Sequence, residues 1–154
     1  MKLALFFPVW NKMPARDQFH DIVIRCLVKV GWTILREHYA VVVADNNDVI
    51  RRLFIDIAAQ SPTAQIVLIE VKSLESSPTR QFMTLVGQYL VHRTALDSLG
   101  NATPLYVAIS DKDYERIIWQ PLAQNVIRDM LAAPIPFVVF NPAEEEIVEW
   151  IPPL

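Results

Sequence analysis

The sequence predicts an α/β domain in which a mixed β-sheet is flanked by helices. Segments of strand length that are rich in aliphatic residues alternate with longer segments that have helical patterning. Their order is helix, three strands, helix, strand, helix and two strands, which is typical of a sheet sandwiched by helices. Of the 154 residues, 53% are hydrophobic and 20% are charged, which suits one globular domain with a substantial core.

Residues 1–12 are predicted to be a flexible or wrongly assigned N-terminal extension, and residues 13–154 a single domain. The apolar run from Leu3 to Trp10 is too short to span a bilayer, which needs roughly 20 residues. Pro8 interrupts this run and no small-residue cleavage site follows it, so the run does not fit a signal peptide. Met13 looks like a second start. We therefore expect no membrane association and a cytoplasmic location.

The first helix is predicted over residues 14–30. Pro14 suits a first helical turn, Asp17 suits the positive end of the helix dipole, and Gly31 marks the stop. The apolar stripe of this helix consists of Phe19, Val23, Cys26, Leu27 and Val30. Because Cys26 is the single cysteine, no internal disulfide can form, and its place in the stripe predicts a buried, inert thiol.

Extended segments are predicted to follow this helix. Their ranges are 32–35, 39–44, 52–58 and 66–72, and polar turn clusters at 45–48 and 61–63 separate them. The second half begins with a helix that runs from the loop at 76–79 to about Ser98. The elements after it are a strand over 104–110, a helix over 112–131 interrupted before Pro121, and strands over 135–140 and 147–151.

The formal net charge of −3 argues against a protein that coats nucleic acid by electrostatics alone. Residues 1–100 contain 11 basic and 9 acidic side chains, whereas residues 101–154 contain 3 and 8. A polyanion should therefore meet the first part of the chain. The candidates for phosphate contacts, which could equally be solvated surface, are Arg51, Arg52, Arg80 and Arg93. The acidic run 144–146 is interpreted as a soluble turn or a partner surface.

The strand over residues 66–72 ends with a carboxylate and an amine where core residues are expected. Residues i and i+2 of a strand project from the same face, so Glu70 and Lys72 should stand side by side. A second carboxylate, Asp56, lies in the preceding apolar strand. These two carboxylates and the carbonyl oxygen of Val71 could hold a hard cation such as Mg²⁺. Lys72 would then orient an attacking water or neutralise charge on a phosphate.

A simpler interpretation of the same residues needs no metal. Asp56 could lie at a strand end in solvent, while Glu70 and Lys72 pair with each other across one face. Burial of these groups without an ion or a partner would be costly, because a charged group loses its hydration there. The residue pattern by itself leaves both interpretations open.

The pattern of Asp56 followed by Glu70-Val71-Lys72, within this order of elements, resembles the PD-(D/E)XK nuclease superfamily. More closely, residues 13–154 resemble the XisH family, the fdxN element excision controlling factor proteins of cyanobacteria. The blocks that carry this resemblance are Met13-Pro14-Ala15-Arg16-Asp17, Phe19-His20-Asp21, Gly31-Trp32-Thr33-Ile34, Asp56, Glu70-Val71-Lys72-Ser73, Gly87-Gln88-Tyr89, Asn141-Pro142 and Ile147-Val148-Glu149-Trp150-Ile151-Pro152. The carboxylate–lysine core is weakly specific, and the ordered set of blocks is much more so.

The resemblance implies that residues 13–154 form a single domain with a restriction-endonuclease-like (PD-(D/E)XK) fold, and it implies a role in DNA element excision during heterocyst development. Carried over by position, Asp56 and Glu70 are the metal carboxylates and Lys72 is the catalytic lysine. The implied cofactor is Mg²⁺ or Mn²⁺, and the implied reaction is phosphodiester hydrolysis. Ile55 stands where the superfamily name has proline, at a position that varies in such folds.

Two further residues are candidates for the catalytic site. The superfamily often carries another acid on its first helix, where Asp17, His20 and Asp21 lie. Of these, His20 is a candidate base or ligand, with a hydrogen-bonded histidine at the core boundary as the alternative. Gln88 follows the carboxylate–lysine strand on the next helix and either faces the site or belongs to an ordinary polar helix face. His92 is a weaker candidate, because the family suggests an aromatic residue near this position.

The resemblance also implies partners, namely DNA, a companion excision factor of the XisI type and a site-specific recombinase, and it allows a homo-oligomer. The alternative to an endonuclease is a non-catalytic accessory factor that binds DNA or the companion protein. A further alternative is a toxin-like or defence nuclease that its partner holds inactive. The acidic balance favours the accessory role, because a nuclease that works alone usually carries more basic surface.

Overall fold

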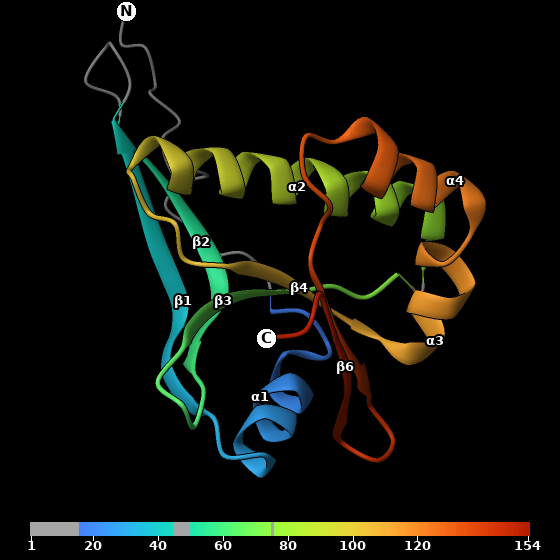
Figure 1. The fold of residues 1–154 in the computed structure, drawn as a ribbon, viewed down its shortest axis with the longest axis horizontal. Helices are drawn as coiled ribbons and strands as arrows, with labels where there is room; N and C mark the ends of the chain where they lie inside the picture. Colours follow the sequence, from blue (N-terminus) through green and yellow to red (C-terminus); the bar gives the residue numbers. More distant parts are fainter. Residues whose placement is uncertain (1–15, 45–49, 75) are drawn as a thin grey trace, which may run out of the picture.

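The computed structural model describes residues 16–44, 50–74 and 76–154. All the described strands belong to one sheet, and helices lie on both sides of it (Figure 1). In chain order the elements are α1 (His20–Lys29), β1 (Thr33–Ala44), β2 (Ile50–Gln60), β3 (Ile66–Val71), α2 (Pro78–Ser98), β4 (Leu105–Ser110), α3 (Asp111–Asp113), the π-helical turn η1 (Tyr114–Ile118), α4 (Pro121–Gln124), the π-helical turn η2 (Asn125–Met130), β5 (Phe137–Asn141) and β6 (Glu146–Ile151).

The sheet is mixed, with six strands in the order β1-β2-β3-β4-β5-β6. Strands β1, β2 and β3 pair antiparallel, β3, β4 and β5 pair parallel, and β6 returns antiparallel to β5. The parallel pairs require crossovers, which α2 supplies between β3 and β4 and the α3-to-η2 segment supplies between β4 and β5. The predicted mixed α/β architecture is therefore confirmed.

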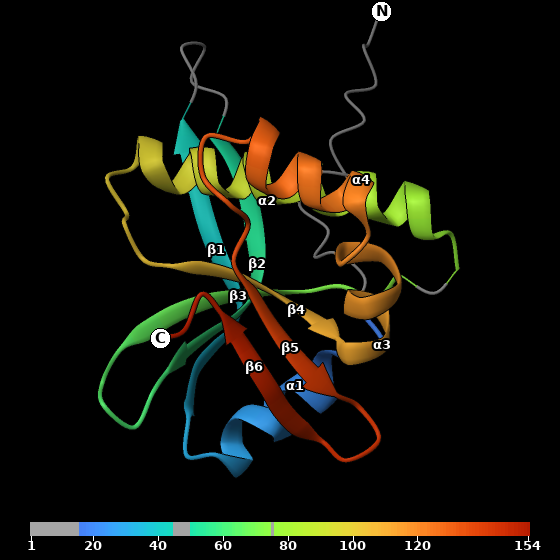
Figure 2. The ribbon, with the colours of Figure 1, turned by 45° about the vertical axis from the view of Figure 1, so that its right-hand side comes forward.

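Helices on opposite faces of the sheet cover two separate cores. In both views α2 and α4 lie on one side of the sheet, and α1 lies on the other (Figure 1, Figure 2). Under α2 the core includes Leu85, Leu96 and Leu68. Under α1 it includes Val23 and Ile69. Burial on both faces explains why β3 reads as a nearly continuous aliphatic run, as central strands with parallel neighbours do.

The first helix begins later than the sequence predicted. It starts at His20, and the described residues before it, 16–19, form an irregular segment and a turn. The cause is Asp17, whose carboxylate accepts hydrogen bonds from the N–H groups of Phe19 (2.9 Å) and Ser73 (3.1 Å). An aspartate that bonds to nearby backbone in this way favours a turn over continued helix. Pro14 lies outside the described residues.

The two short extended segments predicted at 32–35 and 39–44 are one strand, β1. It is irregular rather than interrupted, with a register shift between Ile34 and Arg36 and a positive φ of 53° at His38. The turn predicted at 45–48 lies outside the described residues. The long helix predicted over 112–131 is broken into four short pieces, with the interruption before Pro121 where it was expected.

In the ranges that the structure describes, no helix has the length and apolarity needed to cross a membrane. The extension predicted over residues 1–12 lies outside these ranges. Cys26 is fully buried, as its place in the apolar stripe predicted, and burial raises the pKa of its thiol to about 11. A thiol with that pKa is almost entirely protonated at neutral pH and is a poor nucleophile.

Candidate functional site

Two central strands bring Asp56 and Glu70 to neighbouring positions. Strands β2 and β3 pair antiparallel up to Ile57 opposite Ile69, and Asp56 and Glu70 are the next residue on each strand. On its other side, Asp56 lies between the β1–β2 pairs Glu37–Ile57 and Tyr39–Ile55, where His38 has its positive φ. The backbone is therefore irregular at Asp56, and the side chain reaches the end of β3.

The Asp56 carboxylate is held in place by β3. Its Oδ2 accepts a hydrogen bond from the backbone N–H of Val71 at 2.8 Å. Burial raises the pKa of Asp56, and the negative charge of Glu70 raises it further. The Val71 N–H, His20 and Lys72 lower this pKa, but burial and the charge of Glu70 outweigh them. Asp56 is thus neither at a strand end nor freely solvated.

Glu70 is 5% exposed and faces helix α2. Its Oε1 lies 2.7 Å from Nδ1 of His92, within ion-pair distance. This contact is not aligned as a hydrogen bond, so neither buried atom has a well-oriented hydrogen-bond partner among the described residues. Such a buried polar atom costs free energy unless another group, such as a cation, satisfies it.

Lys72 completes the predicted triad at the end of β3. It is half-buried. Its positive charge partly offsets the raised pKa values of Asp17 and Asp56, which indicates that the ammonium group lies near both carboxylates. Within the described residues no ion pair joins Lys72 to Glu70, so the simple pairing of these two side chains is not what the structure contains. Lys72 instead belongs to the Asp56 side of the site.

Two acids, one half-buried and one buried, hold the loop that follows β3. Asp17 accepts the N–H of Ser73, and burial, as the largest cause, raises the pKa of Asp17. Asp113, which is 2% exposed, accepts the N–H of Leu74 at 3.0 Å and a hydrogen bond from Arg116 at 3.1 Å. Because both acids lie outside β3 itself, they fix the loop beyond Lys72 from two directions.

The remaining predicted site residues differ in burial and in the groups that they contact. His20 is fully buried, and its Nε2 lies 2.8 Å from Oε1 of Glu37. Gln88 is exposed on α2, one helical turn before His92. The N–H of Val71, rather than its carbonyl, contacts the Asp56 carboxylate. The predicted catalytic roles of His20 and Gln88 and the predicted ligand role of the Val71 carbonyl stay predictions.

Sequence reasoning underestimated His92 and did not find Asp113. His92 is 9% exposed and is the side chain of α2 that meets Glu70. Its signal was present, because it shares one helix face with Gln88 at a spacing of four residues. Asp113 gave no comparable signal, since it lies in an exposed-looking polar stretch after β4.

The charged surface candidates divide into structural and exposed groups. Arg93 is largely engaged, because it bonds Asp97 and the carbonyl oxygens of Asn101 and Thr103. Arg52 and Arg80 are exposed, and the side chain of Arg51 is outside the described part of the chain. The acidic run 144–146 covers the end of the β5–β6 turn and the first residue of β6, and Glu145 accepts hydrogen bonds from Arg25 of α1. These hydrogen bonds therefore tie α1 to the β5–β6 turn.

Asp56 and Glu70 fit the donor set that a hard divalent cation requires. They are two carboxylates on adjacent strands, and the buried Oε1 of Glu70 has an ion-pair contact with His92 but no well-aligned hydrogen bond. Burial, and then the negative charge of Glu70, raise the pKa of Asp56. A cation bound by both would remove this repulsion, and Mg²⁺ is usually held by one or two carboxylates plus water.

Comparison with known proteins identifies the family of this chain. A family model described as XisH protein matches residues 13–148. The crystal structure of an XisH family protein from Nostoc punctiforme PCC 73102 has a TM-score of 0.74 and 26% identity, over 87% of this chain and 98% of that chain. That of an fdxN element excision controlling factor protein from Anabaena variabilis has a TM-score of 0.75 and 29% identity, over 88% and 99%. A search of curated proteins finds no match. Because the family model spans most of its length, the chain belongs to the XisH family.

Proposed function

We propose that this protein is a DNA element excision controlling factor with a restriction-endonuclease-like fold that hydrolyses phosphodiester bonds with Mg²⁺ or Mn²⁺. Membership of the XisH family supports the excision role, and so does the likeness to the Anabaena variabilis excision controlling factor. The mixed sheet with helices on both faces supports the fold. The companion excision factor, the recombinase and DNA are the partners that this proposal requires.

The observation that carries the hydrolytic part is the pairing of Asp56 and Glu70. The two carboxylates stand at neighbouring positions of adjacent strands in a largely buried place. The pKa of Asp56 is raised, and the contact of Glu70 with His92 is not aligned as a hydrogen bond. A purely structural role gives no reason to place two acids side by side there, because buried like charges oppose folding. Strain of this kind is typical of a site that is completed by its ligand.

Each residue of the site has a definite role in this proposal. A bound divalent ion would act as a Lewis acid on the phosphate and lower the pKa of a water. Asp56 and Glu70 would hold that ion, and the Val71 N–H would orient Asp56. Lys72 would face the phosphate and offset charge that develops on it. His20 would help to lower the pKa of Asp56. Gln88, which is exposed on α2, would contact DNA.

Plasmid nicking tests this function. Purified protein should convert supercoiled DNA to the open circle with Mg²⁺ or Mn²⁺, and Glu70→Gln should lower the rate by at least about 100-fold, because removal of one electrostatic contact at a reacting centre has that scale. Glu115→Gln, which changes an exposed acid on η1, is the matched control and should keep full activity. Equal nicking by Glu70→Gln and the control would refute the hydrolytic role.

The accessory role remains the second candidate, and the charge of the chain is the observation that favours it. The net charge is −3, and Arg93 is held by carbonyl oxygens of the loop that follows α2 rather than offered to DNA. A non-catalytic factor would bind DNA or its companion protein equally well with and without a divalent ion. Binding that is independent of metal, together with an absence of nicking when the companion factor is present, would decide for this role.

A further inference from the structure

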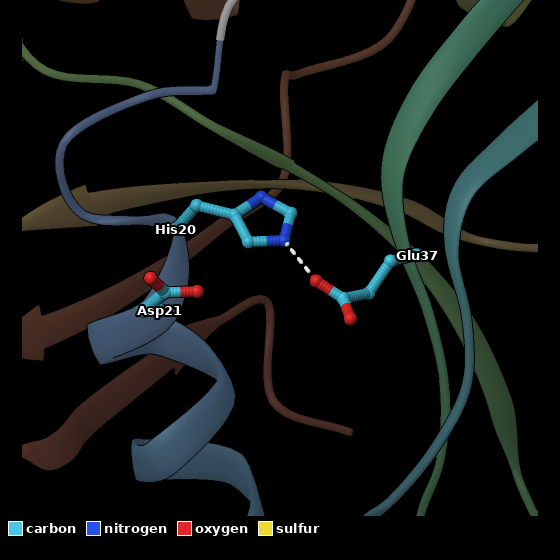
Figure 3. Close-up of side chains that lie close together, drawn as sticks. All are labelled: His20, Asp21 and Glu37. Carbon is cyan, nitrogen blue, oxygen red and sulfur yellow. Dashed lines mark hydrogen bonds and ion pairs between the residues drawn. The ribbon is translucent and has the colours of Figure 1, made fainter.

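A second cluster of ligand-type side chains lies between α1 and β1 and shares no residue with the Asp56–Glu70 pair. Its three members are His20 and Asp21 at the start of α1 and Glu37 on β1 (Figure 3). One ligand atom from each residue lies within 4.8 Å of the other two. We propose that this cluster, called here the His20 cluster, binds a late first-row divalent metal ion, with Zn²⁺ as the best fit.

The histidine of the cluster is held in a fixed position. His20 is fully buried, and its ring stacks on that of His38, with centroids 5.7 Å apart and planes 14° from parallel. Its Nδ1 is buried without a hydrogen-bond partner, so Nε2 is the atom that meets the cluster, 2.8 Å from Glu37 Oε1. Figure 3 shows the ring directed from α1 toward Glu37. A ligand fixed in this way loses little conformational freedom when it binds an ion.

The carboxylates of the cluster are accessible. The side chain of Glu37 is 41% exposed and that of Asp21 is 62% exposed, so an ion could enter from solvent and keep a water ligand. In a tetrahedral Zn²⁺ site the ligand atoms stand about 3.3 Å apart, given bonds of about 2.0–2.1 Å. The present distances, between 2.8 and 4.8 Å, need only small movements of two exposed side chains to reach that arrangement.

A positive charge already occupies part of the cluster. The guanidinium of Arg16 contacts both Glu37 and Asp21, the latter at 3.1 Å. Exposed ion pairs of this kind contribute little to stability, so an ion can displace the arginine at small cost. We infer that Arg16 balances the two carboxylates in the metal-free protein and competes with the ion for them.

The donor set indicates which metal the His20 cluster prefers. One imidazole nitrogen and two carboxylate oxygens suit Zn²⁺ or Co²⁺, whereas Mg²⁺ prefers oxygen ligands alone. Three protein ligands with an open position are the pattern of sites that hold a water or a substrate group. The His20 cluster therefore differs in chemistry from the all-oxygen pair of Asp56 and Glu70.

Cobalt titration of the full chain tests this site. The titration uses the Asp56→Asn/Glu70→Gln variant as background, so that Co²⁺ bound by the proposed hydrolytic pair does not contribute to the signal. The visible absorption of Co²⁺ is followed. A tetrahedral absorption band should appear and should disappear when Zn²⁺ is added. Glu37→Gln and Asp21→Asn should each weaken Co²⁺ binding at least about tenfold, since even outer-shell changes have that effect. Arg16→Ala should strengthen it, because the competing cation is gone.

Substitutions at exposed positions keep this test independent of folding. Glu37 and Asp21 are accessible, so their amides should not unfold the protein, whereas substitution of the buried His20 risks doing so. Glu115→Gln, another exposed acid, is the matched control and should bind Co²⁺ like the background variant. The site is refuted if Co²⁺ binds equally to the Glu37→Gln and Glu115→Gln variants, or if the background variant gives no tetrahedral band.

Discussion

Asp56 shows at the scale of one residue how a candidate site opposes stability. Burial, and then the charge of Glu70, raise its pKa above the value of 3.8 that an unperturbed aspartate has. The folded protein therefore binds a proton more readily than the unfolded chain does. Above the raised pKa the ionised carboxylate destabilises the fold, and this penalty is relieved as the pH falls through the raised pKa toward 3.8.

Asp56→Asn should consequently be more stable than the natural protein at neutral pH in the absence of divalent ions. The amide oxygen can still accept the Val71 N–H, while the buried charge is gone. The advantage should shrink as the pH approaches 3.8, which urea denaturation at several pH values would measure. Asp129→Asn, at an exposed position, is the control and should change little. A variant that is less stable at neutral pH would contradict the sign of this argument.

The residues of the site were predictable to different degrees. Asp56 and Glu70 stood out because each carboxylate interrupts an aliphatic strand, where an unexplained charge is conspicuous. The contact between Glu70 and His92 was not predictable, since it depends on how α2 is rotated against the sheet. Asp113 was missed because its partner, the N–H of Leu74, is 39 residues away and leaves no local pattern.

At the scale of single elements, helix α2 has room for a larger side chain at its one glycine. Gly87 lies inside this helix, and a Cβ added there would have no atom within 4 Å. Gly87→Ala should raise the free energy of unfolding by about 1 kcal/mol, because glycine loses more conformational entropy in a helix. Thermal unfolding should report an increase of about 2–4 °C in Tm.

Gly31 provides the matched opposite case. It follows α1 with a φ of +88°, and an added Cβ would stand 3.2 Å from Cγ of Pro62. Gly31→Ala should therefore lower the free energy of unfolding by about 1–2 kcal/mol, the usual cost of a left-handed conformation. If both alanine variants shifted Tm in the same direction, local backbone conformation would not be what distinguishes these two positions.

Elements with a strong local pattern were predicted well, and elements decided by distant contacts were not. Strand β3 and helix α2 match the predicted ranges closely, because a continuous aliphatic run and a proline-started helix are local signals. The start of α1 was wrong because Asp17 bonds to Ser73, far along the chain. The fusion of two segments into β1 depends on an irregular residue, His38, whose positive φ no propensity indicates.

At the scale of the whole molecule, the candidate site joins parts that fold around separate cores. Asp56 and Glu70 come from central strands, His92 comes from α2 on one face, and Asp17 leads into α1 on the other. An ion bound by the two carboxylates would therefore stabilise the native arrangement of both faces at once. The unfolded chain lacks this arrangement, so binding should add directly to the free energy of unfolding.

Mn²⁺ should accordingly raise the Tm of the natural protein. At a free concentration about 100 times the dissociation constant, the gain is about 2.7 kcal/mol, which corresponds to about 5–10 °C for a domain of this size. Glu70→Gln should lose most of this increase, and a chelator should reverse it. Asp21→Asn, which disables the His20 cluster but leaves the Asp56–Glu70 pair intact, is the control and should keep the increase. A shift that persists in Glu70→Gln but disappears in Asp21→Asn would assign the stabilising ion to the other cluster, and would leave the central carboxylates without evidence of a metal.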